Sequence, residues 1–311
     1  MPDRTDFFSQ LRLPVIAAPM FLVSGPELVI AAGKAGIVGT FPALNGRTSA
    51  AFEEMLVKIE RELGSPGQTA PAPFGVNLIA HKTNARLNDD LAICVKHRVP
   101  LVITSIGAVP DLVEQVHGYG GMVFHDVGTV AHARKAAAAG VDGLVLISAG
   151  GGGHSMTMNP FAFLAEVREF FDGFIVLAGC LSTGKDIAAA RVAGADMAYM
   201  GTRFICTRES MANDAYKQMI VDARADDVVH TAAFSGAPAM FLKESIIRAG
   251  LDPENLQDRA RGDFGEAPRG QKAWTDILGA GQGVGSCNDT PPVATLVERL
   301  EAEYRQAVKR A

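Results

Sequence analysis

Short apolar runs alternate with helix-length stretches along the first two thirds of the chain. The runs are four or five residues long and nearly continuous in apolar character, which is typical of strands buried on both faces of a parallel sheet. The pattern predicts eight such strands, at Val15–Ala18, Ile37–Phe41, Phe74–Leu78, Leu101–Thr104, Met122–His125, Gly143–Ile147, Phe174–Leu177 and Met197–Met200.

Amphipathic or alanine-rich stretches separate these runs, and each is read as a helix. Several of them end in glycine followed by an apolar residue, as at Gly36-Ile37 and Gly140-Val141. A glycine at this place caps the helix and leads the chain directly into the next strand. Helices are expected at Pro26–Ala35, Ser49–Leu63, Ala85–His97, Pro110–His117, Val130–Ala139, Pro160–Phe171 and Gly184–Ala193.

Eight strands alternating with helices fit a (β/α)8 barrel, the TIM-barrel fold of the α/β class, because this barrel closes at eight strands. The alternative is an open, doubly wound sheet, which usually has fewer strands and carries its glycine fingerprint after the first strand. Here the first strand leads into Ala17-Ala18-Pro19-Met20, without a GxGxxG sequence. The barrel is therefore the predicted fold.

The alternation stops after the eighth strand. Residues 208–279 are polar and rich in loop-forming sequence, with helical pieces expected at Asp214–Ala225 and Ala239–Ala249. We interpret them as a small, mostly helical insertion, or lid, on a barrel formed by residues 1–207 and 280–311. The amphipathic stretch Pro292–Lys309 is expected to pack on the barrel as its last helix.

Composition limits the partners of the chain. Of its 311 residues, 48% are hydrophobic and 20% are charged, and the net charge of −5 argues against nucleic acid or an anionic membrane as a partner. The polar N-terminal residues do not resemble a signal peptide, and no apolar run is long enough for a membrane span. The four cysteines show no metal-binding spacing. We expect a cytoplasmic protein without a metal, in an oligomeric state that the sequence leaves open, a homo-oligomer included.

A glycine-rich sequence follows the sixth predicted strand, where Gly150 begins a run of four glycines that ends at His154. Glycine permits positive φ and lets the backbone approach a bound group closely. A histidine at the exit of a barrel strand stands where catalytic groups gather in this fold. The alternative is a flexible loop with an incidental histidine, and the matching loops elsewhere in the chain favour the catalytic interpretation.

The seventh and eighth predicted strands also end in glycine, within Ala178-Gly179-Cys180-Leu181 and Met200-Gly201-Thr202-Arg203. Phosphate usually binds after these two strands of a barrel, where backbone N–H groups turn toward the anion at the start of a helix. Two glycines at the two expected places indicate a phosphate site. Two ordinary tight turns are the alternative.

Together, these motifs resemble those of the nitronate monooxygenase family, formerly the 2-nitropropane dioxygenases. They follow the family's order along nearly the whole chain, and Ala280–Gly285 has a counterpart near the C-terminus of such proteins. The resemblance implies a TIM barrel that binds FMN. The motifs are Ala18-Pro19-Met20, Phe74–Asn77, Gly152-Gly153-His154, Ala178-Gly179 and Met200–Phe204.

The resemblance also assigns a role to each of these positions. His154 would be the catalytic base, because an imidazole that titrates near neutrality can take a proton from carbon next to a nitro group, or hold the resulting anion. The implied cofactor-binding residues are Ala18, Pro19 and Met20 along the flavin ring, Asn77 at its polar edge, Gly152 and Gly153 beside the ring, and Gly179, Cys180, Gly201 and Thr202 at the phosphate.

Several positions depart from the family pattern. Ala18-Pro19-Met20 stands where many members have Gly-Gly-Met, Cys180 replaces a glycine beside the phosphate, and Asp126 stands where some members carry a flavin-contacting lysine. The sequence Ser155–Met158 after the histidine differs from that of the best-characterised subgroup. The substrate is therefore less well defined than the cofactor. Cys180 is expected to be a packing side chain, since no base partner is evident, and His125 either lines the site or is buried for structural reasons.

The implied reaction is the oxidation of alkyl nitronates, and of nitroalkanes as an extension, by molecular oxygen to carbonyl compounds and nitrite. An alternative on the same flavin barrel is an NAD(P)H-dependent reductase of enoyl-thioesters or quinones. A third interpretation is a flavin-free isomerase of a phosphate-containing metabolite. Each of these takes a small-molecule substrate, and the first also uses O2.

Overall fold

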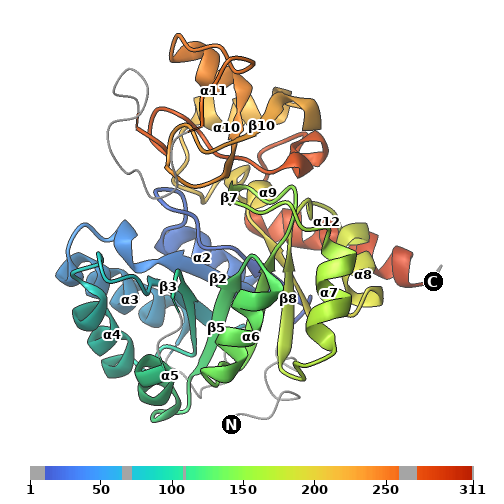
Figure 1. The fold of residues 1–311 in the computed structure, drawn as a ribbon. Helices are drawn as coiled ribbons and strands as arrows, with labels where there is room; N and C mark the ends of the chain where they lie inside the picture. The colour runs from blue at the N-terminus through green and yellow to red at the C-terminus, as the bar shows by residue number, and fades with distance from the viewer. Residues whose placement is uncertain (1–10, 65–71, 108–109, 259–271, 310–311) are drawn as a thin grey trace.

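The computed structural model describes residues 11–64, 72–107, 110–258 and 272–309 (Figure 1). Its centre is a closed barrel of eight parallel strands in the order β1-β2-β3-β4-β5-β6-β8-β9. β1 pairs with β9 as well as with β2, which closes the barrel and excludes the open sheet. The predicted TIM barrel is confirmed. The strands are β1 (Val15–Ala17), β2 (Val38–Pro42), β3 (Phe74–Ile79), β4 (Leu101–Ser105), β5 (Met122–Val127), β6 (Gly143–Ile147), β8 (Phe174–Ala178) and β9 (Met197–Met200).

Helices cover the outside of the barrel where the amphipathic stretches predicted them. Thr48, Thr129 and Asn159 each begin a helix by accepting a hydrogen bond from a backbone N–H of its first turn. Within the described residues, no helix is both long and apolar enough to cross a bilayer. The outer helices are α2 (Pro26–Lys34), α3 (Ser49–Leu63), α4 (Leu87–Lys96), α5 (Pro110–His117), α6 (Val130–Ala138), α7 (Pro160–Arg168), α8 (Gly184–Val192) and α12 (Val293–Val308).

Side chains alternate along each strand between the barrel interior and the surrounding helices. Ile103 and Phe124 belong to the apolar cluster that fills the interior. Two residues further along their strands, Ser105 and Asp126 therefore occupy inward positions, and the same alternation turns Asn77 inward on β3. Polar side chains thus replace apolar ones inside the barrel at the carboxyl ends of three neighbouring strands. We call this end of the barrel its mouth.

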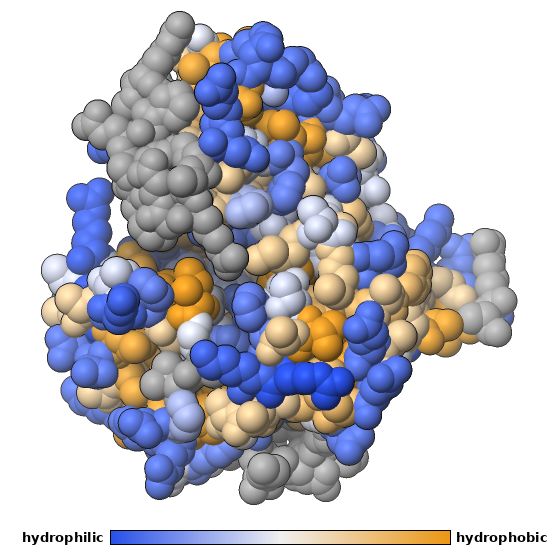
Figure 2. All heavy atoms as spheres, viewed as in Figure 1, coloured by the Kyte–Doolittle hydropathy of each residue, from blue (hydrophilic) through white to orange (hydrophobic). Residues whose placement is uncertain are grey.

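The described residues 208–258 and 272–279, named the upper segment, lie over the mouth, at the top of Figure 1. They contain α10 (Asp214–Asp222), β10 (Val228–Thr231), β11 (Ala239–Leu242) and α11 (Lys243–Arg248). β11 pairs with β10 and also with β7 (Gly153–His154), which follows β6, so a three-stranded antiparallel sheet joins this segment to the barrel. On the face in Figure 2, hydrophilic and hydrophobic residues are interspersed over both the barrel and the upper segment.

The helix expected at 239–249 begins only at Lys243, because the preceding residues form β11. The four residues of this strand are all apolar and buried. A short apolar run is compatible with a buried strand or a buried helix, and periodicity does not distinguish them. These residues form a strand because β10 and β7 supply its hydrogen-bonding partners.

Candidate active site

The loops that follow β6 and β8 meet at Cys180. Gly150 has a φ of 81°, and a Cβ on it would lie 2.1 Å from the sulfur of Cys180. Gly179 and Cys180 have φ values of 130° and 55°, in the left-handed region that favours glycine. Cys180 therefore carries backbone strain that a glycine would not. Cys180 is exposed, and partial burial of its thiol raises the pKa, which argues against an activated nucleophile.

A third loop connects the predicted phosphate residues with the glycine run. The N–H of Gly281 donates to Oγ1 of Thr202 at 2.9 Å, and the N–H of Gln282 donates to the carbonyl oxygen of Gly150 at 2.9 Å. A Cβ on Gly152 would lie 2.8 Å from the Gly281 nitrogen. The ends of β6, β8 and β9 are thus held together by the segment that leads into the short helix η4 (Gln282–Ser286).

The loop after β1 lies beside the end of β9. The N–H of Ala18 donates to the carbonyl oxygen of Met200 at 3.0 Å, and Pro19 and Met20 follow directly. A Cβ on Gly201 would lie 3.5 Å from the sulfur of Met20, which is an ordinary van der Waals contact. The described residues therefore leave room for a side chain at Gly201. In this respect it differs from Gly150 and Gly152, whose neighbours exclude one.

His154 lies on β7, where its backbone pairs with Ala239 of the upper segment. Its imidazole packs edge-on against the indole of Trp274, with the ring centres 5.4 Å apart. The residue remains exposed overall. Partial removal from water lowers the pKa of the imidazole below its usual value, so the ring is neutral at neutral pH and able to accept a proton.

Asn77 belongs to a hydrogen-bond chain that crosses three strands. Its Nδ2 donates to the Ile103 carbonyl oxygen at 3.2 Å and to Oγ of Ser105 at 2.8 Å. Ser105 in turn donates to Oδ2 of Asp126 at 2.6 Å. Oδ1 of Asp126 is shielded from water and has no partner among the described residues, and the same holds for the hydroxyl of Tyr199. Burial raises the pKa of Asp126 to about 7.

His125 points away from this chain, as the strand alternation requires. It is buried and its Nδ1 lies 2.7 Å from Oγ1 of Thr104. Burial lowers its pKa to about 4, so the imidazole stays neutral. Of the two interpretations that the sequence left open, the structural one is supported. Within the described ranges, no group of three or more His, Cys, Asp or Glu side chains could hold a metal ion.

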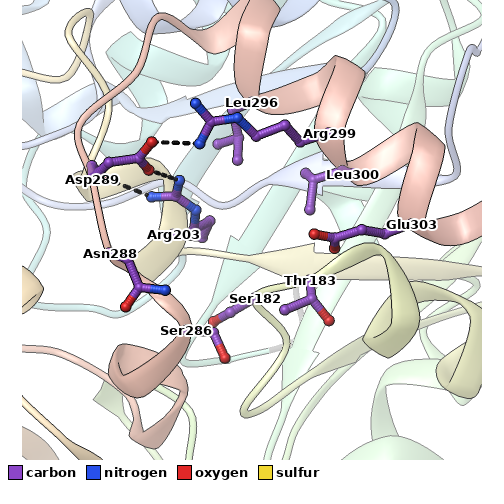
Figure 3. A pocket seen from close by; sticks show the side chains of 10 residues that line it. All are labelled: Ser182, Thr183, Arg203, Ser286, Asn288, Asp289, Leu296, Arg299, Leu300 and Glu303. Atoms are coloured by element: carbon purple, nitrogen blue, oxygen red, sulfur yellow. Dashed lines mark hydrogen bonds and ion pairs between the residues drawn. The ribbon is translucent and has the colours of Figure 1, made fainter.

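A cavity of about 220 Å³ lies outside this constellation, between α8, α12 and the chain after η4 (Figure 3). Arg203 is buried there and pairs with Asp289 at 2.7 Å, and Asp289 also pairs with Arg299. Figure 3 shows these three side chains turned toward one another on one side of the cavity and Glu303 on the other. None of the site residues predicted from the sequence lines it. Both arginines pair with Asp289, and Glu303 accepts a hydrogen bond from the N–H of Gly184 at 2.7 Å.

Two contributors to the site were not recognised in the sequence. Ser105 is a polar residue at an inward position at the end of β4, and the strand register gave a signal that could have identified it. Trp274 is the single tryptophan of the chain and lies 120 positions from the histidine it packs against, so no local pattern relates the two. By contrast, the predicted residues at the ends of β1, β6, β8 and β9 lie next to one another. Asn77 lies in its own network, on β3.

Comparison with known proteins identifies the family. Residues 85–303 match the family model for nitronate monooxygenase. A nitronate monooxygenase from Pseudomonas aeruginosa is 29% identical over 78% of this chain and 80% of its own. A crystal structure of nitroalkane oxidase from Streptomyces ansochromogenes superposes with a TM-score of 0.83 at 24% identity, covering 98% of this chain and 99% of that one, which supports the fold.

A second kind of relative carries a different name. A (3aS,4S,5R,7aS)-5-hydroxy-7a-methyl-1-oxo-octahydro-1H-indene-4-carboxyl-CoA dehydrogenase from Mycobacterium tuberculosis is 28% identical over 80% of this chain. The match spans 67% of that dehydrogenase, and 64% of its counterpart from Rhodococcus jostii, so this chain covers about two thirds of these relatives. The family model itself matches well over half of the chain, and the chain therefore belongs to the nitronate monooxygenase family, a family of flavin-dependent oxidoreductases.

Proposed function

We propose that the protein binds FMN at the barrel mouth and oxidises alkyl nitronates, and nitroalkanes after their deprotonation, with molecular oxygen to carbonyl compounds and nitrite. The observation that carries this proposal is the position of His154, a neutral imidazole directly after a glycine run at the end of a barrel strand. Membership of the nitronate monooxygenase family supports the substrate class.

The residues at the mouth fit a flavin nucleotide. A Cβ on Gly201 would make only ordinary contacts, and this glycine begins the short helix α9 (Thr202–Ile205), whose first N–H groups can receive a phosphate. Gly179 and Cys180 would complete that subsite. Ala18, Pro19 and Met20 would contact the ring from the end of β1, with Gly152 and Gly153 beside it and Asn77 at its polar edge.

The proposed roles of the protein side chains are simple. His154 takes a proton from the carbon next to the nitro group, or holds the nitronate anion when that proton has already been lost. When bound, a flavin held by these residues would supply the electron acceptor for the reaction with oxygen. The upper segment would act as a lid on the barrel formed by residues 1–207 and 280–311, since β11 reaches His154 and Trp274 covers its ring.

The second candidate is an NAD(P)H-dependent flavin reductase that acts on a thioester or a quinone. It is favoured by the relatives that are named dehydrogenases of a CoA ester. It would use the same flavin subsites, with His154 as an acid instead of a base.

Anaerobic mixing distinguishes the two candidates. The purified protein is loaded with FMN and mixed without oxygen with an alkyl nitronate or with NAD(P)H, and the flavin absorbance near 450 nm is followed. Fast bleaching by the nitronate alone supports the proposed function. Fast bleaching by NAD(P)H alone rejects it in favour of the reductase. A protein that does not bind FMN at all contradicts both.

A further inference from the structure

The amide of Asn77 is held in one orientation by the residues beneath it. Both of its N–H bonds are used, one on the Ile103 carbonyl oxygen and one on Ser105. The hydroxyl of Ser105 has a single proton, and this proton goes to Asp126. While Asp126 is ionised, above its pKa of about 7, Ser105 can therefore only accept from Asn77. Turning the amide over would place its oxygen against two acceptors.

One polar atom of this chain remains available to a ligand. Oδ1 of Asn77 has no hydrogen-bond partner among the described residues, and unlike Oδ1 of Asp126 it is not among the atoms shielded from water. Asn77 is on an inward position near the end of β3 and is only 6% exposed. The single face that it offers is thus an acceptor directed at the barrel mouth.

We infer that Asp126 and Ser105 are positioning residues that fix Asn77 as a hydrogen-bond acceptor, and that the mouth thereby selects a ligand with an N–H donor, the imide of the flavin. This inference rests on the proposed function for the identity of the ligand, but the hydrogen-bond relay itself does not. Asp126 acts at a distance, through the direction in which the Ser105 hydroxyl points. Among the residues that the structure describes, the other titratable group facing Asp126 is Tyr199, whose buried hydroxyl has no hydrogen-bond partner there.

The relay is tested first in the ligand-free protein. The Tm values of Asn77→Ala, Asp126→Asn and the double variant are compared with that of the natural protein. The same cycle is then repeated in proteins that also carry Ser105→Ala. Because Ser105 lies between the two residues, their Tm losses should be non-additive when it is present and additive when it is absent. Additive losses in both backgrounds would overturn the relay, whatever the protein binds.

The acceptor is tested by comparing FMN with its N3-methyl analogue, which lacks the imide N–H. The natural protein should bind FMN about tenfold more tightly, as expected for the loss of one hydrogen bond to a buried partner. Asp126→Asn lets residue 126 donate to Ser105, and Ser105→Ala leaves only the 3.2 Å bond to Ile103, so each should lower this ratio by at least about threefold.

Thr104→Val is the matched control. It removes a buried hydroxyl from the same strand, on the face that meets His125, and should cost stability without changing the ratio. An unchanged ratio in Asp126→Asn and Ser105→Ala, or an equal change in Thr104→Val, would refute the selection of an N–H donor. Failure of the natural protein to bind either flavin would instead refute the proposed function, and the thermal cycle would still decide the relay.

Discussion

The environment of His154 is compatible with its proposed role as a base. Its side chain has no hydrogen-bond partner among the described residues, and its one ring contact is the edge-on packing with Trp274. Its lowered pKa keeps the imidazole neutral over the physiological range. A neutral imidazole whose nitrogens have no partner among the described residues can exchange a proton with a substrate.

Replacing this histidine should separate two substrates. His154→Ala should lower kcat/KM for neutral nitroalkanes by roughly 10²–10⁴-fold, because the proton at carbon has to be removed, and should affect preformed nitronates less. Since the pKa is lowered, the acid limb of the natural protein's nitroalkane kcat/KM profile should fall below the usual imidazole value of 6.5. Steady-state kinetics with each nitroalkane and its nitronate provide the measurement. Equal small losses on both substrates would mean that His154 is not the base.

The glycines at the mouth differ in whether neighbouring protein atoms exclude a side chain at their position. Gly150 and Gly152 would clash with neighbouring atoms if they carried a Cβ, whereas Gly201 would make only ordinary contacts and its φ of −99° suits any residue. The absence of a Cβ at Gly201 thus fits the proposed approach of a phosphate to the backbone there.

Gly201→Ala should therefore leave the ligand-free protein nearly as stable as before while weakening FMN at least about tenfold, roughly 1.4 kcal/mol. Gly285→Ala is the control, because its added Cβ would also meet only an ordinary contact, at 3.9 Å, without lying at the phosphate subsite. Tm without cofactor and fluorescence titration with FMN are the two readouts. Equal FMN affinity in the two variants would remove Gly201 from the proposed site.

At the scale of elements, the ends of β6 and β8 are matched to each other through one side chain. Cys180 tolerates a positive φ of 55°, and its sulfur fills the space that a Cβ on Gly150 would occupy. The cysteine therefore imposes glycine on the opposite loop. The strain at Cys180 and the glycine at 150 are two parts of one arrangement.

This coupling predicts the behaviour of a double variant. Gly150→Ala should destabilise the protein by roughly 2–4 kcal/mol, from its left-handed backbone and the steric clash together. Cys180→Gly should relieve both the backbone strain at residue 180 and the clash with the Cβ at residue 150. The double variant should therefore recover the share of the unfolding free energy that Gly150→Ala loses to the clash, and should still lack the share lost to the left-handed backbone at residue 150. Urea unfolding of the four proteins measures the cycle. Strict additivity would show that the two loops are independent.

The whole molecule divides its contacts between a barrel and an upper segment. The loops at the ends of β1, β8 and β9, together with Gly281, surround the proposed phosphate subsite. The upper segment reaches the mouth on the other side, through β11 and through Trp274, which packs on both His154 and Phe241. Cofactor and substrate contacts are thus expected from different parts of the chain.

Truncating the tryptophan should reveal this division. Trp274→Ala removes the apolar face against His154, so kcat/KM for a nitronate should fall by about tenfold while the FMN dissociation constant changes little. Phe234→Leu is a useful control, since Phe234 packs on Phe241 from within the same segment without contacting His154. A loss of FMN affinity in Trp274→Ala equal to its loss in kcat/KM would contradict the role of the upper segment as a lid over the substrate.

The sequence by itself determined the barrel and identified the loops at its mouth where we propose the active site. The eight buried strands are nearly continuous apolar runs, and glycines follow the sixth, seventh and eighth of them. Both features could be identified in the sequence because each is local. The predicted residues of these loops indeed meet, since the carboxyl ends of parallel strands lie at one end of a closed barrel.

Only the tertiary structure decided what depends on pairing between distant segments. β11 is a strand because β10 and β7 supply its hydrogen bonds, and an apolar run of four residues could equally have begun a helix. Trp274 on His154, Cys180 against Gly150, and the relay from Asp126 to Asn77 all join residues that the chain brings together only on folding. Such neighbours set the direction of a hydroxyl proton and the space beside a glycine. Neither can be predicted from the local sequence.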